Sequence, residues 1–171
     1  IVQTFALILI CVVLIYTGET IAAVSNKAEY IQLWLQLKWI GQVMLPAVYM
    51  HFSDALLTVS GRPSRGRRKS FVWLTYLITG IAALLIFFGI TVGGLTSENA
   101  PMFYLERNQL TFFFGIFYIL VMAMVSYNLI RAMIRTATKT GLRRMIYLLA
   151  GAAAIAFSSI IFLFHGNNWF A

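Results

Sequence analysis

Long apolar stretches, nearly free of charged side chains, constrain the fold of this chain more than any other feature. They cover about 1–24, 33–59, 71–95, 110–134 and 145–164. A helix needs ~20 predominantly apolar residues to cross a bilayer, and a segment in lipid has to satisfy its backbone amides internally. None of the stretches alternates as a barrel strand does. We therefore predict an all-α fold, a polytopic transmembrane bundle of five membrane-spanning helices in a single domain over 1–171.

The composition excludes a soluble globular domain. Hydrophobic residues make up 61% of the chain and charged residues 11%, whereas soluble domains carry roughly 45–50% apolar and about 25% charged residues. A monomer in water would have to expose this apolar excess, so the surrounding solvent has to be lipid.

The distribution of charge predicts how the chain is oriented. Five basic residues lie between Arg62 and Lys69 and five more between Arg131 and Arg144, with no acidic residue in either segment. Such loops are typical of the cytoplasmic side. The stretches 17–32 and 96–109 carry four glutamates against one lysine and one arginine, so we place them outside. The Ile1 end is then cytoplasmic and the Ala171 end outside.

The net charge of +8 has a second interpretation, because basic proteins often bind nucleic acid. Here the positive charges are confined to short loops between apolar segments, so we expect no nucleic-acid partner. The expected partners are the lipid bilayer, its anionic lipids, and other membrane-protein subunits or a homodimer partner. The five basic residues of the first loop are the predicted anionic-lipid contacts, although they serve equally well as a topology signal alone; they are Arg62, Arg65, Arg67, Arg68 and Lys69.

Polar residues on the segment 33–59 are the candidates for a binding site. Lys38 and Gln42 are four residues apart near its outer end, where Lys38 can extend to the interface or line an outward-facing cleft. Trp34, beside them, is an interfacial anchor or a ligand-stacking side chain. Pro46 removes a backbone hydrogen bond just below this stripe, which predicts a kink that serves as a hinge.

His51 and Asp54 form a second candidate pair. Their i, i+3 spacing puts both on one helix face, toward the cytoplasmic end. Ionisable residues at membrane depth usually face a partner or a cavity. The pair is therefore a proton- or ligand-sensitive site, or Asp54 simply reaches the headgroups or the basic loop that follows.

Small residues predict close helix packing at two places. These are Gly89-x-x-x-Gly93 and the run 150–156, which would place the third and fifth segments inside the bundle.

Enzymatic signatures are missing from the sequence. It has no phosphate-binding glycine loop, no metal-ligand spacing of Cys and His, and no carboxylate pair close in sequence. A haem shared by His51 and His165 is excluded within one chain because their depths should differ by roughly 20 Å. We expect a non-enzyme with no cofactor and no metal.

The run from Tyr30 to Phe52 carries a family resemblance. Trp34, the Trp39-x-Gly41 step and Leu45-Pro46 followed by Tyr49 resemble the third helix of the seven-transmembrane sensory region found before bacterial histidine kinases and diguanylate cyclases. The segment 138–151 is similar to the basic entry to that family's sixth helix. The resemblance implies that the five stretches are helices two to six of such a region, in a bacterial cytoplasmic membrane.

Two functions follow as expectations. The first is a non-catalytic sensory or interaction module, in which the outer polar stripe meets a ligand or partner and the Pro46 hinge passes a helix shift inward. The alternative is an accessory structural subunit of a large membrane complex, respiratory or photosynthetic. The first and seventh helices and a kinase core are absent from this sequence, so we expect either a fragment of a sensor or a small subunit.

Overall fold

The computed structural model describes residues 1–61, 66–95, 105–136 and 138–164. In this part of the chain there are five helices and two short strands: α1 (Val2–Val24), α2 (Ala28–Val59), α3 (Arg67–Phe87), β1 (Val92–Leu95), β2 (Leu105–Arg107), α4 (Gln109–Ile134) and α5 (Lys139–Phe164). The predictions for Arg62, Arg65 and His165 fall outside the described residues.

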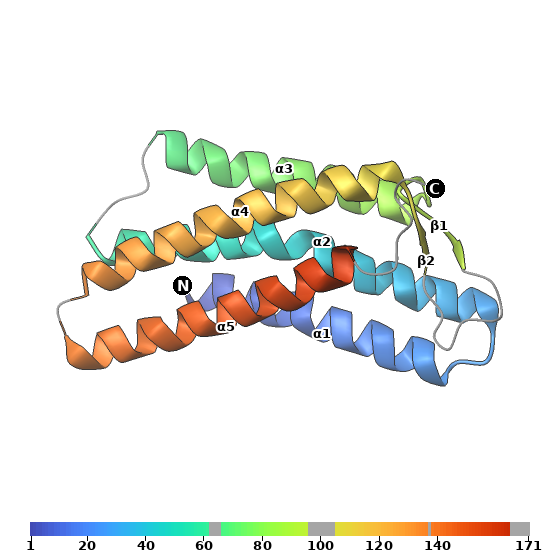
Figure 1. Cartoon of the computed structure of the whole chain (residues 1–171), viewed down its shortest axis with the longest axis horizontal. Coiled ribbons are helices and arrows are strands. Elements are labelled where there is room, and N and C mark those ends of the chain that lie inside the picture. The colour runs from blue at the N-terminus through green and yellow to red at the C-terminus, as the bar shows by residue number, and fades with distance from the viewer. Residues whose placement is uncertain (62–65, 96–104, 137, 165–171) are drawn as a thin grey trace.

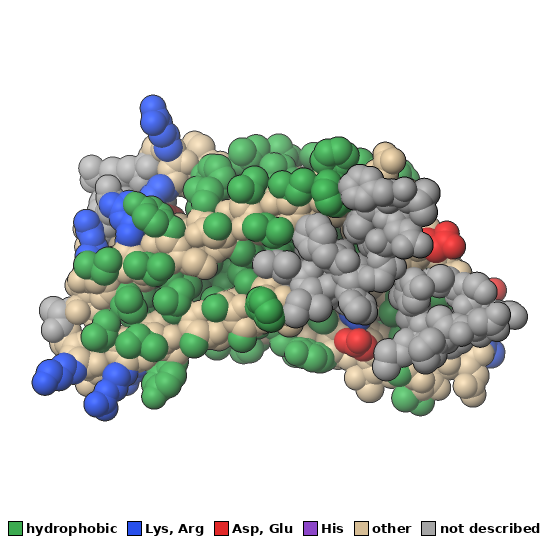
Figure 2. Space-filling model, viewed as in Figure 1, with side chains coloured by type: hydrophobic (Ala, Val, Ile, Leu, Met, Phe, Trp, Pro, Cys, Tyr) green, Lys and Arg blue, Asp and Glu red, His purple; other side chains and the backbone are tan. Residues whose placement is uncertain are grey.

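Successive helices run in alternating directions (Figure 1). The α1–α2 connection and the two strands lie at one end of the bundle, and the ends of α2, α3, α4 and α5 that flank the two basic segments lie at the other. Figure 2 shows Lys and Arg side chains gathered at that second end, acidic side chains toward the first, and an apolar belt between them. The separation of charge predicted from the sequence is therefore present in the folded chain.

Four helices of the described chain are long and apolar enough to cross a membrane, namely α1, α3, α4 and α5. The predicted five spans are thus confirmed only in part, because α2 is not among them. Its length of 32 residues is ample, but Lys38, Gln42, His51 and Asp54 lower its hydropathy. The physical reason for this polarity is the position of α2 within the bundle.

Helix α2 is the centre of the fold. It packs against α1, α3 and α4 and also meets both strands, while α5 packs mainly against α4. Of its 32 residues 17 are buried, including Leu45, Ala47 and Ser53 with no exposed surface. A helix surrounded by protein does not need an apolar surface all round, since its polar side chains find partners on its neighbours.

The third segment is shorter than the predicted 71–95. Helix α3 ends at Phe87, and Gly89 follows with φ of +70°, a backbone conformation that L side chains rarely adopt. Val92–Leu95 then pairs antiparallel with Leu105–Arg107. Asn108 Nδ2 donates to Ile90 O at 2.9 Å and Thr111 Oγ1 to Thr91 O at 3.1 Å, which ties the hairpin to the start of α4.

The closest helix contact lies between α1 and α2, not at the predicted small-residue sites. A Cβ added to Gly18 would lie 2.7 Å from the Trp34 carbonyl oxygen, and one added to Gly41 would lie 3.0 Å from the Cys11 carbonyl oxygen. The prediction that Gly89-x-x-x-Gly93 marks a helix-packing site was wrong, because both glycines follow the end of α3.

The predicted burial of the fifth segment is also wrong. Helix α5 is the least covered of the four apolar helices, and a Cβ added to Gly151 would meet no atom within 4 Å. Only one edge of the run 150–156 packs on the bundle, because Ala152 is buried and Ala156 lies against the core, whereas 150, 151, 153 and 154 are exposed.

Candidate functional site

The predicted site residues fall into two separate groups along α2. Trp34, Lys38 and Gln42 lie toward the hairpin end, while His51 and Asp54 lie toward the basic end. Lys38 and His51 are thirteen positions apart, which corresponds to roughly 20 Å along a helix axis. The two groups therefore form two sites, not one.

The residues of the outer group are covered by α1. Lys38 Nζ lies 3.1 Å from Glu19 Oε1, and the lysine side chain is only 9% exposed whereas that of Glu19 is 55% exposed. The expectation that Lys38 extends to the interface was wrong, because α1 approaches closely enough at Gly18 to supply a carboxylate. Trp34 is half-buried, and its backbone carbonyl forms part of the same contact.

Within the described residues, neither of the two cavities at hand is lined by Lys38 or Gln42, so the predicted outward-facing cleft stays a prediction. Gln42 is buried, and among the described residues its side-chain nitrogen has no hydrogen-bond partner. A cavity of about 20 Å³ lies under the hairpin, but it is lined by Trp39, Val43 and residues of α3, α4 and β1 and not by Lys38 or Gln42. Pro46 is buried within a helix that continues on both sides of it, and its role as a hinge stays a prediction.

The inner group makes specific contacts with α3. His51 Nδ1 lies 3.2 Å from the Tyr76 hydroxyl, and the two rings meet edge to face with centroids 5.8 Å apart. Arg68 Nε lies 2.9 Å from Asp54 Oδ1. Asp54 thus faces the first turn of α3, where backbone N–H groups and three consecutive basic residues favour a carboxylate.

The contact with Asp54 changes the prediction for one of the basic residues. Arg68 was expected to contact anionic lipid, but its side chain is 24% exposed and lies against the carboxylate of Asp54. Asp54 was expected to form a proton- or ligand-sensitive site with His51, or to reach the headgroups or the basic segment. The structure contains an ion pair between Asp54 and Arg68, at the end of that basic segment. Arg67 and Lys69, which flank Arg68, are exposed, and their contact with lipid stays a prediction.

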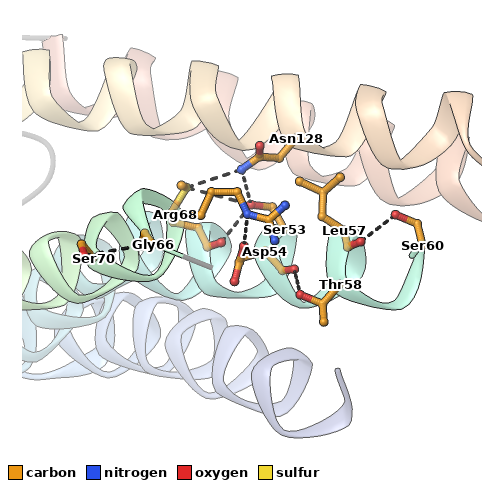
Figure 3. A network of polar contacts seen from close by, with 10 residues as sticks. Ser53, Asp54, Leu57, Thr58, Ser60, Gly66, Arg68, Ser70 and Asn128 are labelled. Carbon is orange, nitrogen blue, oxygen red and sulfur yellow. Dashed lines mark hydrogen bonds and ion pairs between the residues drawn. The ribbon is translucent and has the colours of Figure 1, made fainter. Parts of the chain in front are cut away.

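A second polar contact joins the same part of α2 to α4 (Figure 3). Asn128 Nδ2 donates to Ser53 Oγ at 3.2 Å and lies 3.9 Å from the Met50 sulfur. Ser53 Oγ in turn donates to the Met50 carbonyl at 2.8 Å. Adjacent residues, Ser53 and Asp54, thus hold α2 to α4 and to α3 respectively.

His51 and Asp54 border a cleft of about 650 Å³ near the basic end of the bundle. It lies between α1 and α3 on the surface of α2, and is lined by Leu7, His51, Asp54, Lys69, Val72, Trp73 and Tyr76. Cavities of ~300–1,000 Å³ that are mostly apolar with a few polar groups are typical of small-molecule sites. This cleft is the candidate functional site.

Sequence reasoning missed the α3 side of the cleft. Trp73 and Tyr76 had the signal that would have revealed it, because 69, 72, 73 and 76 follow the i, i+3, i+4, i+7 spacing of one helix face. That spacing places a lysine, a tryptophan and a tyrosine together. The spacing does not predict which helices line the cleft together with this face of α3, and these are α1 and α2.

The chemistry available in the cleft is that of binding. It offers an imidazole, a carboxylate already paired with a guanidinium, an ammonium and two aromatic rings. Within the described residues no three His, Cys, Asp or Glu side chains lie close enough together to hold a metal ion.

No family model, curated protein or solved structure matches this chain. The geometry of the cleft and the distribution of charge are therefore the basis for assigning a function.

Proposed function

We propose that this chain is a non-catalytic sensory or interaction module of a bacterial cytoplasmic membrane. The observation that supports this proposal most directly is the pair His51 and Asp54, which lies on the central helix, borders a cleft and contacts α3 through Tyr76 and Arg68. Ionisable groups at membrane depth are costly and usually functional. A change of charge or ligand at this pair would act directly on the α2–α3 contact.

The proposal includes a fifth membrane crossing by α2. Helices α1 and α3 are both apolar enough to span, and both run from the basic end to the hairpin end. The chain can follow that course only if α2 returns it across the bilayer between them. At 1.5 Å per residue its 32 residues extend ~48 Å, more than the ~30 Å hydrocarbon core.

Cysteine labelling tests the orientation that accompanies this proposal. In a Cys11→Ala background, we expect a cysteine at Ser60 or Thr138 to be shielded from an impermeant thiol reagent in intact cells, and one at Ser25 to be labelled. The reason is that basic segments stay on the cytoplasmic side. Permeabilised cells, in which all three should react, provide the control. Labelling of position 60 in intact cells would reverse the topology.

A distance measurement tests the sensory role. Spin labels at Val59, exposed at the basic end of α2, and at Ser70, exposed at the basic end of α3, report how these two ends lie relative to each other. We expect Asp54→Asn to shift the distance distribution in reconstituted protein, because the amide removes the charge that holds Arg68 and frees α2 from the first turn of α3.

The control for this experiment is Glu106→Gln, the same chemical change at an exposed position on β2. It should leave the distances unchanged. If Asp54→Asn also leaves them unchanged, the cleft does not govern the helix positions. The alternative, an accessory structural subunit of a larger membrane complex, would then be the better account.

A further inference from the structure

We propose that the cleft between α1 and α3 binds one anionic phospholipid of the cytoplasmic leaflet, with its phosphate at Lys69 and an acyl chain along Leu7, Val72 and Trp73. This inference rests on the orientation given in the proposed function. It concerns one bound molecule in a defined cleft, in addition to the general attraction of the basic loop for the membrane surface.

The shape of the cleft supports a lipid occupant. Its walls are α1 and α3, which both pack on α2, and its floor is formed by His51 and Asp54 of α2. Leu7 is 40% exposed and Trp73 69% exposed, so both walls reach the outer surface of the bundle. A space of about 650 Å³ that opens toward lipid would be filled by lipid.

The charges of the cleft favour an anionic headgroup. Asp54 is neutralised by Arg68 at 2.9 Å, and His51 contacts the Tyr76 hydroxyl. Lys69 is exposed and takes part in neither of the two salt bridges found in the described chain. Because the charges of Asp54 and Arg68 offset each other, the ammonium of Lys69 gives the cleft a net positive charge. This charge complements a phosphate at headgroup level.

The apolar walls account for the rest of the molecule. Leu7, Val72 and Trp73 present aliphatic and aromatic surface, and Trp side chains favour the interfacial level of a bilayer. An acyl chain on these residues places the headgroup beside Lys69, one turn nearer the start of α3 than Trp73.

Native mass spectrometry of the whole chain, released from membranes of mixed phosphatidylglycerol and phosphatidylethanolamine, tests the charge. We expect the wild type to retain phosphatidylglycerol preferentially and Lys69→Gln to lose about fivefold of that preference, the equivalent of about 1 kcal/mol for one charge. The matched control is Lys139→Gln, which removes an exposed cation from the first turn of α5. Equal losses in the two variants would assign the preference to general surface charge and overturn the proposal.

A pair of tryptophan substitutions tests the location. Leu7→Trp should fill the cleft and reduce retention of either lipid, whereas Leu9→Trp, at a 49% exposed position of α1 outside the cleft, should not. Equal retention in these two variants would place the lipid elsewhere. A wild type that holds phosphatidylethanolamine as well as phosphatidylglycerol would show that the occupant is not selected by charge, and would also overturn the proposal.

Fluorescence provides an independent measurement on the wild type and on one variant that keeps an aromatic ring in the cleft. Phosphatidylglycerol with brominated chains, present at low mole fraction, should quench the emission of the wild type more than brominated phosphatidylethanolamine does. This excess should disappear in Trp73→Phe, which removes the indole of the cleft. An excess that persists in Trp73→Phe contradicts binding at this place. Neither lipid experiment depends on the spin-label result, so a lipid site without helix movement, or movement without a lipid site, would be recognised separately.

Discussion

Gly18→Leu is expected to separate α1 from α2 and to lower the free energy of unfolding by about 3 kcal/mol, the upper part of the range for overpacking. The added side chain would start 2.7 Å from the Trp34 carbonyl oxygen and 3.0 Å from Lys38 Cβ. Because these atoms belong to or adjoin the backbone of α2, they cannot move aside as a flexible side chain would. The close approach also brings Glu19 to Lys38, so the same change should disrupt that ion pair.

Unfolding in mixed micelles of increasing SDS content measures this effect. Gly80→Leu is the matched control, because Gly80 lies within α3 and a Cβ there would meet no atom within 4 Å. We expect it to change the stability by less than about 1 kcal/mol, since leucine also favours a helix over glycine. Equal midpoints for the two variants would show that the α1–α2 interface tolerates a wider separation than the structure has.

Asp54→Lys is expected to have the second largest effect. It would place an ammonium group beside the Arg68 guanidinium, in a position where the native carboxylate side chain is only 10% exposed. Breaking a buried ion pair destabilises by about 3–5 kcal/mol. Arg68 is 24% exposed and can turn partly toward the headgroups, so we expect about 2–3 kcal/mol. The end of α2 and the start of α3, which meet at the basic end of the bundle, should separate.

The reversed pair distinguishes charge from packing. Asp54→Lys combined with Arg68→Asp should recover at least half of the lost stability, because the two charges again have opposite sign. Lys69→Asp combined with Asp54→Lys is the comparison, since residue 69 is next to the native partner but forms no salt bridge with Asp54 in the structure. Equal recovery in both double variants would mean that the net charge of this end, and not the specific pair, sets the stability.

The sequence predicted the helices well because apolar length is a local property. Helix α1 and helix α4 begin and end within one residue of the predicted 1–24 and 110–134. The predicted third segment failed from Phe88 onward, since the apolar composition of 88–95 is compatible with both helix and strand. The positive φ of Gly89, which ends the helix, is not encoded by hydropathy.

The candidate site was predictable on one helix only. The i, i+3 spacing put His51 and Asp54 on one face of their helix, and both line the same cleft, while their role as a proton- or ligand-sensitive site stays a prediction. Their partners Tyr76 and Arg68 come from another helix, and the rotation of α3 about its axis depends on packing that a single sequence does not specify. The same applies to Lys38, whose proximity to Glu19 depends on the close approach at Gly18 and not on its own helix.

The central position of α2 has a consequence for how the chain is made. On the proposed five-span topology, α2 enters the membrane before α3 and α4 exist, although it is not among the four described helices that are apolar enough to cross by composition. Lys38 can pair at once with Glu19 of α1, which has already been synthesised. Asp54 and Ser53 gain Arg68 and Asn128 only later. On that topology the polar residues in the second half of α2 stay without these partners until α3 and α4 emerge, while α5 can join an assembled four-helix core last.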